Sequence, residues 1–179
     1  MALKPTIYKA NVALSDMDRD YYDQLQLTMA QHPSETSERL LVRMLVFCLN
    51  AHPDLSFTRG LSSVDEPELW QRSLDGRIVN WIEVGQPDVQ RIKKSANKSQ
   101  SVRVYAFGKS AETWWQLHGQ ELMTVPHTQI FMLSWVEIQQ LNQVLARTMD
   151  LSVTIAGNTL YVSTVDNTLE VSVKALGSL

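Results

Sequence analysis

The chain has 179 residues, a net charge of -3 and one cysteine. This length allows one domain with its own hydrophobic core, and a single cysteine excludes an intrachain disulfide framework. The longest uninterrupted apolar run, residues 44–49, is far shorter than the roughly 20 residues that a membrane-spanning helix needs. Residues 1–16 carry no apolar block of signal-peptide length, so we expect one cytoplasmic domain over residues 1–179 with no membrane contact.

The first predicted elements are two strands. Residues 6–14 alternate between two sets of side chains in the period of a strand, and a turn-like segment, 15–20, follows. Leu25, Leu27 and Met29 then supply a return strand.

A largely buried helix is predicted from Pro33 to about Asn50. Proline is tolerated in a first helical turn, and apolar side chains from residue 40 to residue 49 recur at helical spacing. Arg39, Arg43 and Asn50 mark its polar side, whereas Glu38 projects into the apolar stripe.

The middle of the chain alternates strands and helices. Residues 55–61 predict a short strand, and Arg77–Val84 predict a clear one after an Asp-Gly turn. A helix from Pro87 to Lys98 and a strand from Ser101 to Phe107 follow, which implies a parallel strand pair joined by a right-handed crossover. Trp114–Trp115 lie on a short helix that begins at Ser110, and we interpret them as core packing, with base stacking as the alternative.

The carboxyl-terminal third predicts a strand, a helix and a meander. Ser134 and Glu137 form a capping box before a helix that extends to Met149. Around it we expect strands at 129–133, 151–156, 159–165 and 168–174. The whole pattern is that of a mixed α/β chain.

Buried acids are the first sign of chemistry. Glu83 ends a strand that is apolar on both faces, and Glu68 lies in the acidic segment 65–68 around Pro67. A buried carboxylate needs a cation, a hydrogen-bond network or a proton, and Mg²⁺ held by one or two carboxylates is one answer. Two other interpretations stay open: Glu38 as a simple helix N-terminal charge, and Glu83 as an ion-pair partner of an arginine. The candidate arginines are Arg39, Arg43 and Arg91.

The segment Gln86–Lys109 is locally basic. Its net charge is +5, so the rest of the chain carries -8. Arg91, Lys94 and Lys98 share one helix face with Gln90. This face is either a solvated helix surface or a phosphate-binding edge that attracts nucleic acid without reading its sequence.

Several segments together resemble the bacterial YaeQ family over essentially the whole chain. They include Phe57-Thr58-Arg59-Gly60-Leu61-Ser62 and Trp81-Ile82-Glu83-Val84-Gly85-Gln86-Pro87-Asp88, together with residues 7–10, 32–36, 65–67, 69–71 and 114–115. The resemblance implies a fold similar to the PD-(D/E)XK nuclease superfamily. This is a restriction-endonuclease-like core of helix, three strands, helix and strand over residues 34–107, with added N-terminal strands and a C-terminal helix and meander.

The resemblance also implies a site. Glu68 and Glu83 match the two motif acids that hold Mg²⁺, and Glu38 matches an acid of the first core helix that orients water or a second ion. The motif lysine falls at Gly85, so Gln86 or Lys94 takes its role in positioning the nucleophile. The implied function is a metal-dependent phosphodiesterase acting on DNA or RNA. The alternative is a non-catalytic relative that binds nucleic acid or a protein with the same pocket.

Overall fold

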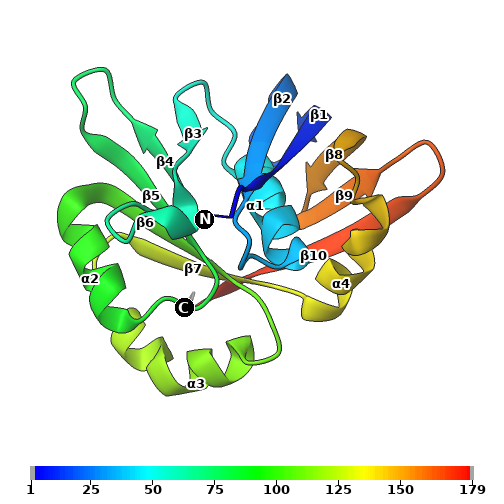
Figure 1. Cartoon of the computed structure of the whole chain (residues 1–179). Helices are drawn as coiled ribbons and strands as arrows, with labels where there is room; N and C mark the ends of the chain where they lie inside the picture. The colour runs from blue at the N-terminus through cyan, green and yellow to red at the C-terminus, as the bar shows by residue number, and fades with distance from the viewer. Residues whose placement is uncertain (1–2, 178–179) are drawn as a thin grey trace. The chain divides into compact units, whose positions relative to one another are not determined.

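The computed structural model describes residues 3–177, and its elements largely follow the predicted order (Figure 1). They are β1 (Thr6–Asp16), β2 (Tyr21–Gln31), α1 (Ser37–Leu49), β3 (Leu55–Phe57), β4 (Leu69–Arg72), β5 (Ile78–Val84), α2 (Val89–Lys98), β6 (Ser99–Ala106), α3 (Ala111–Leu122), β7 (Thr128–Leu133), α4 (Trp135–Leu141), β8 (Thr148–Ala156), β9 (Thr159–Ser163) and β10 (Thr168–Leu176). The mixed α/β class is confirmed. Short 3₁₀ turns occupy Gly60–Ser62 and Asn142–Val144.

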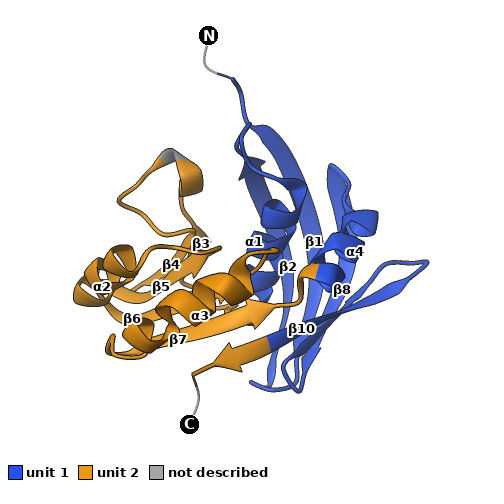
Figure 2. Ribbon diagram, turned by 90° about the horizontal axis from the view of Figure 1, so that it is seen from below, with its two compact units in different colours: residues 1–49, 136–173 blue, residues 50–135, 174–179 orange. Residues whose placement is uncertain are grey.

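The chain divides into two compact units (Figure 2). Unit 1 comprises Met1–Leu49 and Val136–Val173, and unit 2 comprises Asn50–Trp135 and Lys174–Leu179. The expectation of a single domain stays a prediction.

Unit 1 contains a sheet in which β1 is paired on both sides. β1 pairs antiparallel with β2 over its whole length and parallel with β8, and β8, β9 and β10 form the predicted antiparallel meander. The helix predicted to reach Met149 is wrong: α4 ends at Leu141, and Met149 instead pairs with Ala10 in the sheet. Sheet pairing therefore overrides the helical spacing of the apolar residues.

Helix α1 is buried almost all round. Every residue from Leu40 to Cys48 is buried, including Arg43, so the predicted polar side is not a solvent-facing side. The helix begins at Ser37, later than predicted, because residues 33–34 form a turn that is closed by a hydrogen bond from Glu35 N–H to His32 C=O. Burial raises the pKa of the Cys48 thiol to about 12, as expected for a cysteine that only fills core space.

Unit 2 contains the sheet that positions the predicted acids. Its strands run in the order β7-β6-β5-β4-β3, with β5 parallel to β6, as predicted, and antiparallel to β4. Helices α2 and α3 cover one face of β5–β7 through a core that includes Trp81, Ile92, Val104 and Trp114. Trp114 is core, and its indole N–H donates to Pro87 C=O at 3.1 Å.

Two expectations for unit 2 need correction. The predicted strand 55–61 ends at Phe57, because Gly60 has a φ of +56° and opens a 3₁₀ turn. Residue periodicity also did not predict β4, a four-residue strand with a register shift between Gln71 and Arg72. Within residues 3–177, no helix is both long and apolar enough to cross a membrane.

Candidate active site at the end of β5

Glu68 and Glu83 lie side by side in unit 2. The antiparallel register pairs Leu69 with Ile82, and Glu68 N–H donates to Ile82 C=O at 3.0 Å. Glu68 directly precedes β4 and Glu83 directly follows Ile82 on β5, so the two acids lie at the same end of this strand pair, and the charge of Glu68 acts on the Glu83 carboxyl. Both side chains are buried, with relative exposures of 6% and 4%.

The Glu83 carboxylate has two hydrogen-bond donors, and both reach the same oxygen. Trp81 Nε1 lies 2.8 Å and Arg91 Nε 2.7 Å from Glu83 Oε1. Burial raises the pKa of the Glu83 carboxyl, Trp81 and Arg91 oppose the rise, and the neighbouring Glu68 charge adds to it. Of the three arginine partners left open by the sequence, Arg91 is the one found.

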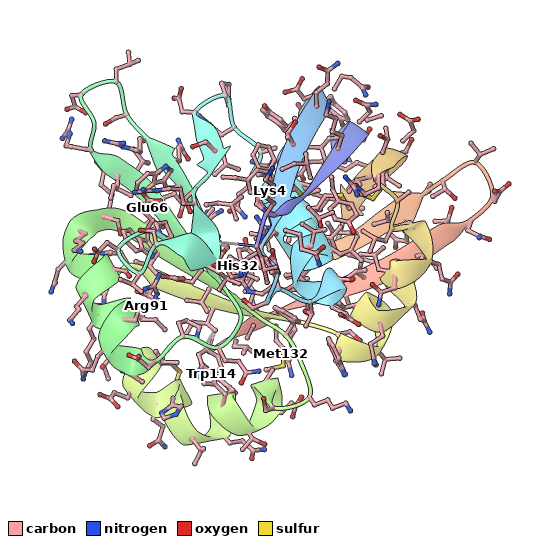
Figure 3. The ribbon with its side chains drawn as sticks, in the orientation of Figure 1. Lys4, His32, Glu66, Arg91, Trp114 and Met132 are labelled. Carbon is pink, nitrogen blue, oxygen red and sulfur yellow. The ribbon has the colours of Figure 1, made fainter. Side chains whose placement is uncertain are left out.

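Arg91 connects Glu83 to the loop between β3 and β4. Its Nη1 donates to Val64 C=O at 2.6 Å and its Nη2 to Glu66 C=O at 2.8 Å. Figure 3 labels Glu66 on this loop and Arg91 on α2, both within unit 2. Helix α2 starts just before Arg91 because Asp88 caps it, accepting a hydrogen bond from Arg91 N–H at 2.8 Å.

A pocket opens next to this ion pair. It has a volume of about 340 Å³ and is lined by Val64, Asp65, Trp81, Asp88, Gln90, Arg91, Lys94, Ser95 and Lys98. The predicted basic face of α2 therefore lines a concave surface. Two of its lining residues, Trp81 and Arg91, are the donors to Glu83.

Lys94 and Lys98 are the two lysines that line this pocket. Both are exposed, and neither has a carboxylate within ion-pair distance in residues 3–177. Lys93 instead points away from the pocket and forms an ion pair with Glu121 of α3 at 2.6 Å. Lys94 lines the pocket and Lys93 does not, and the predicted role of Lys94 stays a prediction.

Gln86 lies outside this pocket, and both polar atoms of its side-chain amide form hydrogen bonds. Its Nε2 donates to Phe107 C=O at 3.0 Å, and its Oε1 accepts from Ser110 Oγ at 3.1 Å. It does not line the pocket that Lys94 lines. Its predicted role in positioning the nucleophile has no support from this geometry.

Gly85 has a physical reason to be glycine. Its φ is +105°, a conformation that residues with a Cβ rarely adopt, although the space around a Cβ at this position is open. A lysine at position 85 would therefore strain the backbone.

Glu38 belongs to α1 in unit 1, and its Oε1 accepts a hydrogen bond from Asn142 Nδ2 at 3.0 Å. Its membership of the site stays a prediction. Across residues 3–177, no three His, Cys, Asp or Glu side chains gather as a metal-binding group.

In unit 2, the carboxylates of Glu68 and Glu83 are the side chains that could hold Mg²⁺. Glu68 and Glu83 are two adjacent buried carboxylates, and Mg²⁺ is commonly held by one or two carboxylates together with waters and substrate phosphate oxygens. They do not form an all-protein cage. Sequence reasoning did not identify Trp81 as part of the site, although its placement two residues before Glu83 on the same strand face was a usable signal.

The chain is similar to known proteins over nearly its full length. The family model described as "YaeQ protein" matches residues 1–173. Proteins from Salmonella typhi and Escherichia coli K12, each described as "Uncharacterized protein YaeQ", are 40% and 38% identical over 176 residues, covering 98% of this chain and 97% of each relative.

Two solved structures are also similar. The crystal structure of YaeQ protein from Xanthomonas axonopodis pv. citri has a TM-score of 0.93 and 36% identity, covering 98% of this chain and 99% of that one. The crystal structure of YaeQ protein from Pseudomonas syringae has a TM-score of 0.92 and 33% identity, covering 98% and 97%. The chain therefore belongs to the YaeQ family.

Proposed function

We propose that the chain is a divalent-metal-dependent phosphodiesterase that acts on nucleic acid in the cytoplasm. The observation that carries the proposal is the pair of adjacent buried carboxylates, Glu68 and Glu83, beside a pocket lined by Lys94 and Lys98, which form no ion pair with the described residues. Two like charges that are both withdrawn from water are costly unless a cation compensates them. The order helix, three strands, helix, strand from α1 to β6 also supports a restriction-endonuclease-like core.

The chemistry divides between the metal and the chain. A Mg²⁺ ion at Glu68 and Glu83 would polarise a phosphoryl oxygen and lower the pKa of a bound water. Lys94 and Lys98 hold the phosphate in the pocket, and Trp81 fixes the orientation of the Glu83 carboxylate. Lys94 also offsets the negative charge that develops on the phosphate.

The second candidate is a nucleic-acid-binding protein without cleavage. Gly85 favours it, because the backbone at the position of the motif lysine has a φ of +105°. Arg91 favours it too, because this arginine already supplies a positive charge to Glu83.

A cleavage assay decides between the two candidates. We expect purified protein with Mg²⁺ or Mn²⁺ to cut single- or double-stranded DNA or RNA oligonucleotides, EDTA to stop the reaction, and Glu68→Gln to be inactive. Binding without cutting in either metal leaves the second candidate. Cutting by Glu68→Gln at the wild-type rate contradicts the site.

Both candidates predict the same role for the pocket lysines. Lys94→Gln combined with Lys98→Gln should weaken nucleic-acid binding uniformly across sequences and reduce the slope of log K against log salt by about 2, because two phosphate contacts are lost. Binding titrations by fluorescence anisotropy at several salt concentrations measure this slope. Lys93→Gln is the matched control, since Lys93 is paired with Glu121, and should leave the slope unchanged. Equal slopes for the double variant and the wild type contradict a phosphate-binding pocket.

A further inference from the structure

Arg91 is the centre of a small network that the proposed chemistry does not use. All three guanidinium nitrogens donate: Nε to the Glu83 carboxylate, and Nη1 and Nη2 to the carbonyls of Val64 and Glu66. We call residues 59–66 the strap. A single side chain thus joins the strap to the acid at the end of β5.

Arg91 supplies two hydrogen bonds that attach the strap to α2. Other hydrogen bonds of the strap are local: Arg59 N–H and Nη2 both donate to the Glu66 carboxylate, Ser63 N–H donates to Gly60 C=O, and Gly60 N–H donates to Thr58 Oγ1 just before the strap. From α2, Arg91 adds the two hydrogen bonds to the carbonyls of Val64 and Glu66. The Val64 side chain is 81% exposed, so burial contributes little at this point.

The strap also lies against the second acid. Gly60 packs so closely on Glu68 that a Cβ at this position would lie 3.0 Å from Glu68 Oε2. Val64 and Asp65 form one wall of the pocket. In this conformation the strap therefore contacts Glu68, is tied to Glu83 and narrows the space beside the pocket lysines.

Binding of a ligand at the site should weaken the ion pair between Arg91 and Glu83. A divalent cation on Glu68 and Glu83 repels a guanidinium that shares the Glu83 carboxylate, and a phosphate in the pocket attracts the same guanidinium. Either ligand weakens the contact between Arg91 and Glu83. Because linkage is reciprocal, a contact that the cation weakens must also weaken binding of the cation.

We propose that Arg91 is a latch that keeps the strap closed over Glu68 and Glu83, and that a divalent cation binding at these carboxylates releases it. This inference rests on the proposed function, because it takes the metal site from it. It goes beyond that function by adding a regulatory step. The strap is either closed or open, and both its opening and the metal affinity report on this one equilibrium.

The test compares wild type, Arg91→Gln, Arg91→Lys and Lys93→Gln. Amide hydrogen exchange of residues 59–66 measures strap opening, and calorimetry with Mn²⁺ measures metal affinity. We expect strap exchange to be at least about tenfold faster in Arg91→Gln, since its hydrogen bonds from a charged group are lost. We also expect Mn²⁺ to accelerate strap exchange in wild type and to bind Arg91→Gln about tenfold more tightly.

Arg91→Lys separates the latch from the charge. It keeps a positive charge near Glu83 but loses the planar fork that reaches two carbonyls. The strap should therefore open, and Mn²⁺ affinity should rise by less than in Arg91→Gln, because the remaining positive charge still repels the cation. Lys93→Gln should match wild type in both measurements. Unchanged exchange of the α2 and β6 amides in each variant shows that unit 2 remains folded.

The outcomes separate the two proposals. Unchanged strap exchange in both Arg91 variants, or equal Mn²⁺ affinity in wild type and Arg91→Gln, overturns the latch and leaves the proposed function standing. Absence of Mn²⁺ binding in every variant overturns the proposed metal site and the latch with it.

Discussion

Glu83→Gln is expected to lower Mn²⁺ affinity and metal-dependent cleavage by more than about 100-fold each. The substitution keeps the size of the side chain and an oxygen for Trp81 Nε1 but removes the buried negative charge. Metal-assisted charge stabilisation is worth several kcal/mol, and about 2.7 kcal/mol corresponds to 100-fold. Calorimetry and a gel-based cleavage assay measure the two effects. Glu121→Gln, which removes an exposed acid paired with Lys93, is the control and should retain both properties.

The Mn²⁺ affinity of the wild type should depend on pH through the Glu83 carboxyl. Burial raises the pKa of Glu83, so its protonated form persists to higher pH than that of an ordinary glutamate. A metal ion binds the deprotonated carboxylate, and Mn²⁺ affinity should therefore fall as the pH is lowered through this raised pKa. Titrations at a series of pH values should show the fall in wild type. A fall that begins only in the range of an exposed glutamate contradicts the assignment of Glu83 as a ligand.

The pairing of Glu83 with Arg91 was within reach of the sequence. A helix that follows directly on a strand returns along the same sheet, so a basic residue eight positions later can reach the strand end. From the sequence alone, Arg39 and Arg43 were equally possible partners of Glu83, because the packing partner of α1 is not evident from its residue pattern. Both prove to pair with Glu35 instead.

The relation of Glu68 to Glu83 was hidden for a different reason. It depends on β4, whose four residues are too few to establish a period of two, and on a register that only long-range pairing sets. The family resemblance implied three strands between the first two helices, and the structure has β3, β4 and β5 there, whereas periodicity predicted two. The contacts of Arg91 with the strap are backbone carbonyl contacts, and these leave no trace in side-chain patterns.

Glu35 was missed as a structural residue for a third reason. Its position near a helix start is typical of an exposed dipole-stabilising acid. In the structure it is buried in unit 1, where Arg43 Nε and Nη2 donate to its two carboxylate oxygens at 2.7 and 2.8 Å and Arg39 adds a further bond at 3.1 Å. A buried arginine inside an apolar helix was the available signal, since it requires a buried acid.

Glu35→Ala should lower the free energy of unfolding by about 3–5 kcal/mol. It leaves the buried Arg43 guanidinium without its carboxylate, and breaking a buried ion pair from one side costs this much because the remaining charge is uncompensated. Urea denaturation followed by circular dichroism measures the change. Glu121→Ala, at an exposed ion pair, is the matched control and should cost at most about 1 kcal/mol.

The double variant Glu35→Leu with Arg43→Met tests the cause of this loss. If the uncompensated charge is responsible, removing both charges should recover most of the stability that Glu35→Ala loses, because apolar side chains of similar size avoid the desolvation cost of the pair. Recovery should stop short of a full return, since Arg43 Nη2 also donates to Ala30 C=O at 2.9 Å and that carbonyl loses its donor. A double variant as unstable as Glu35→Ala would show that the pair contributes through its specific geometry, by fixing the turn before α1 to the end of β2.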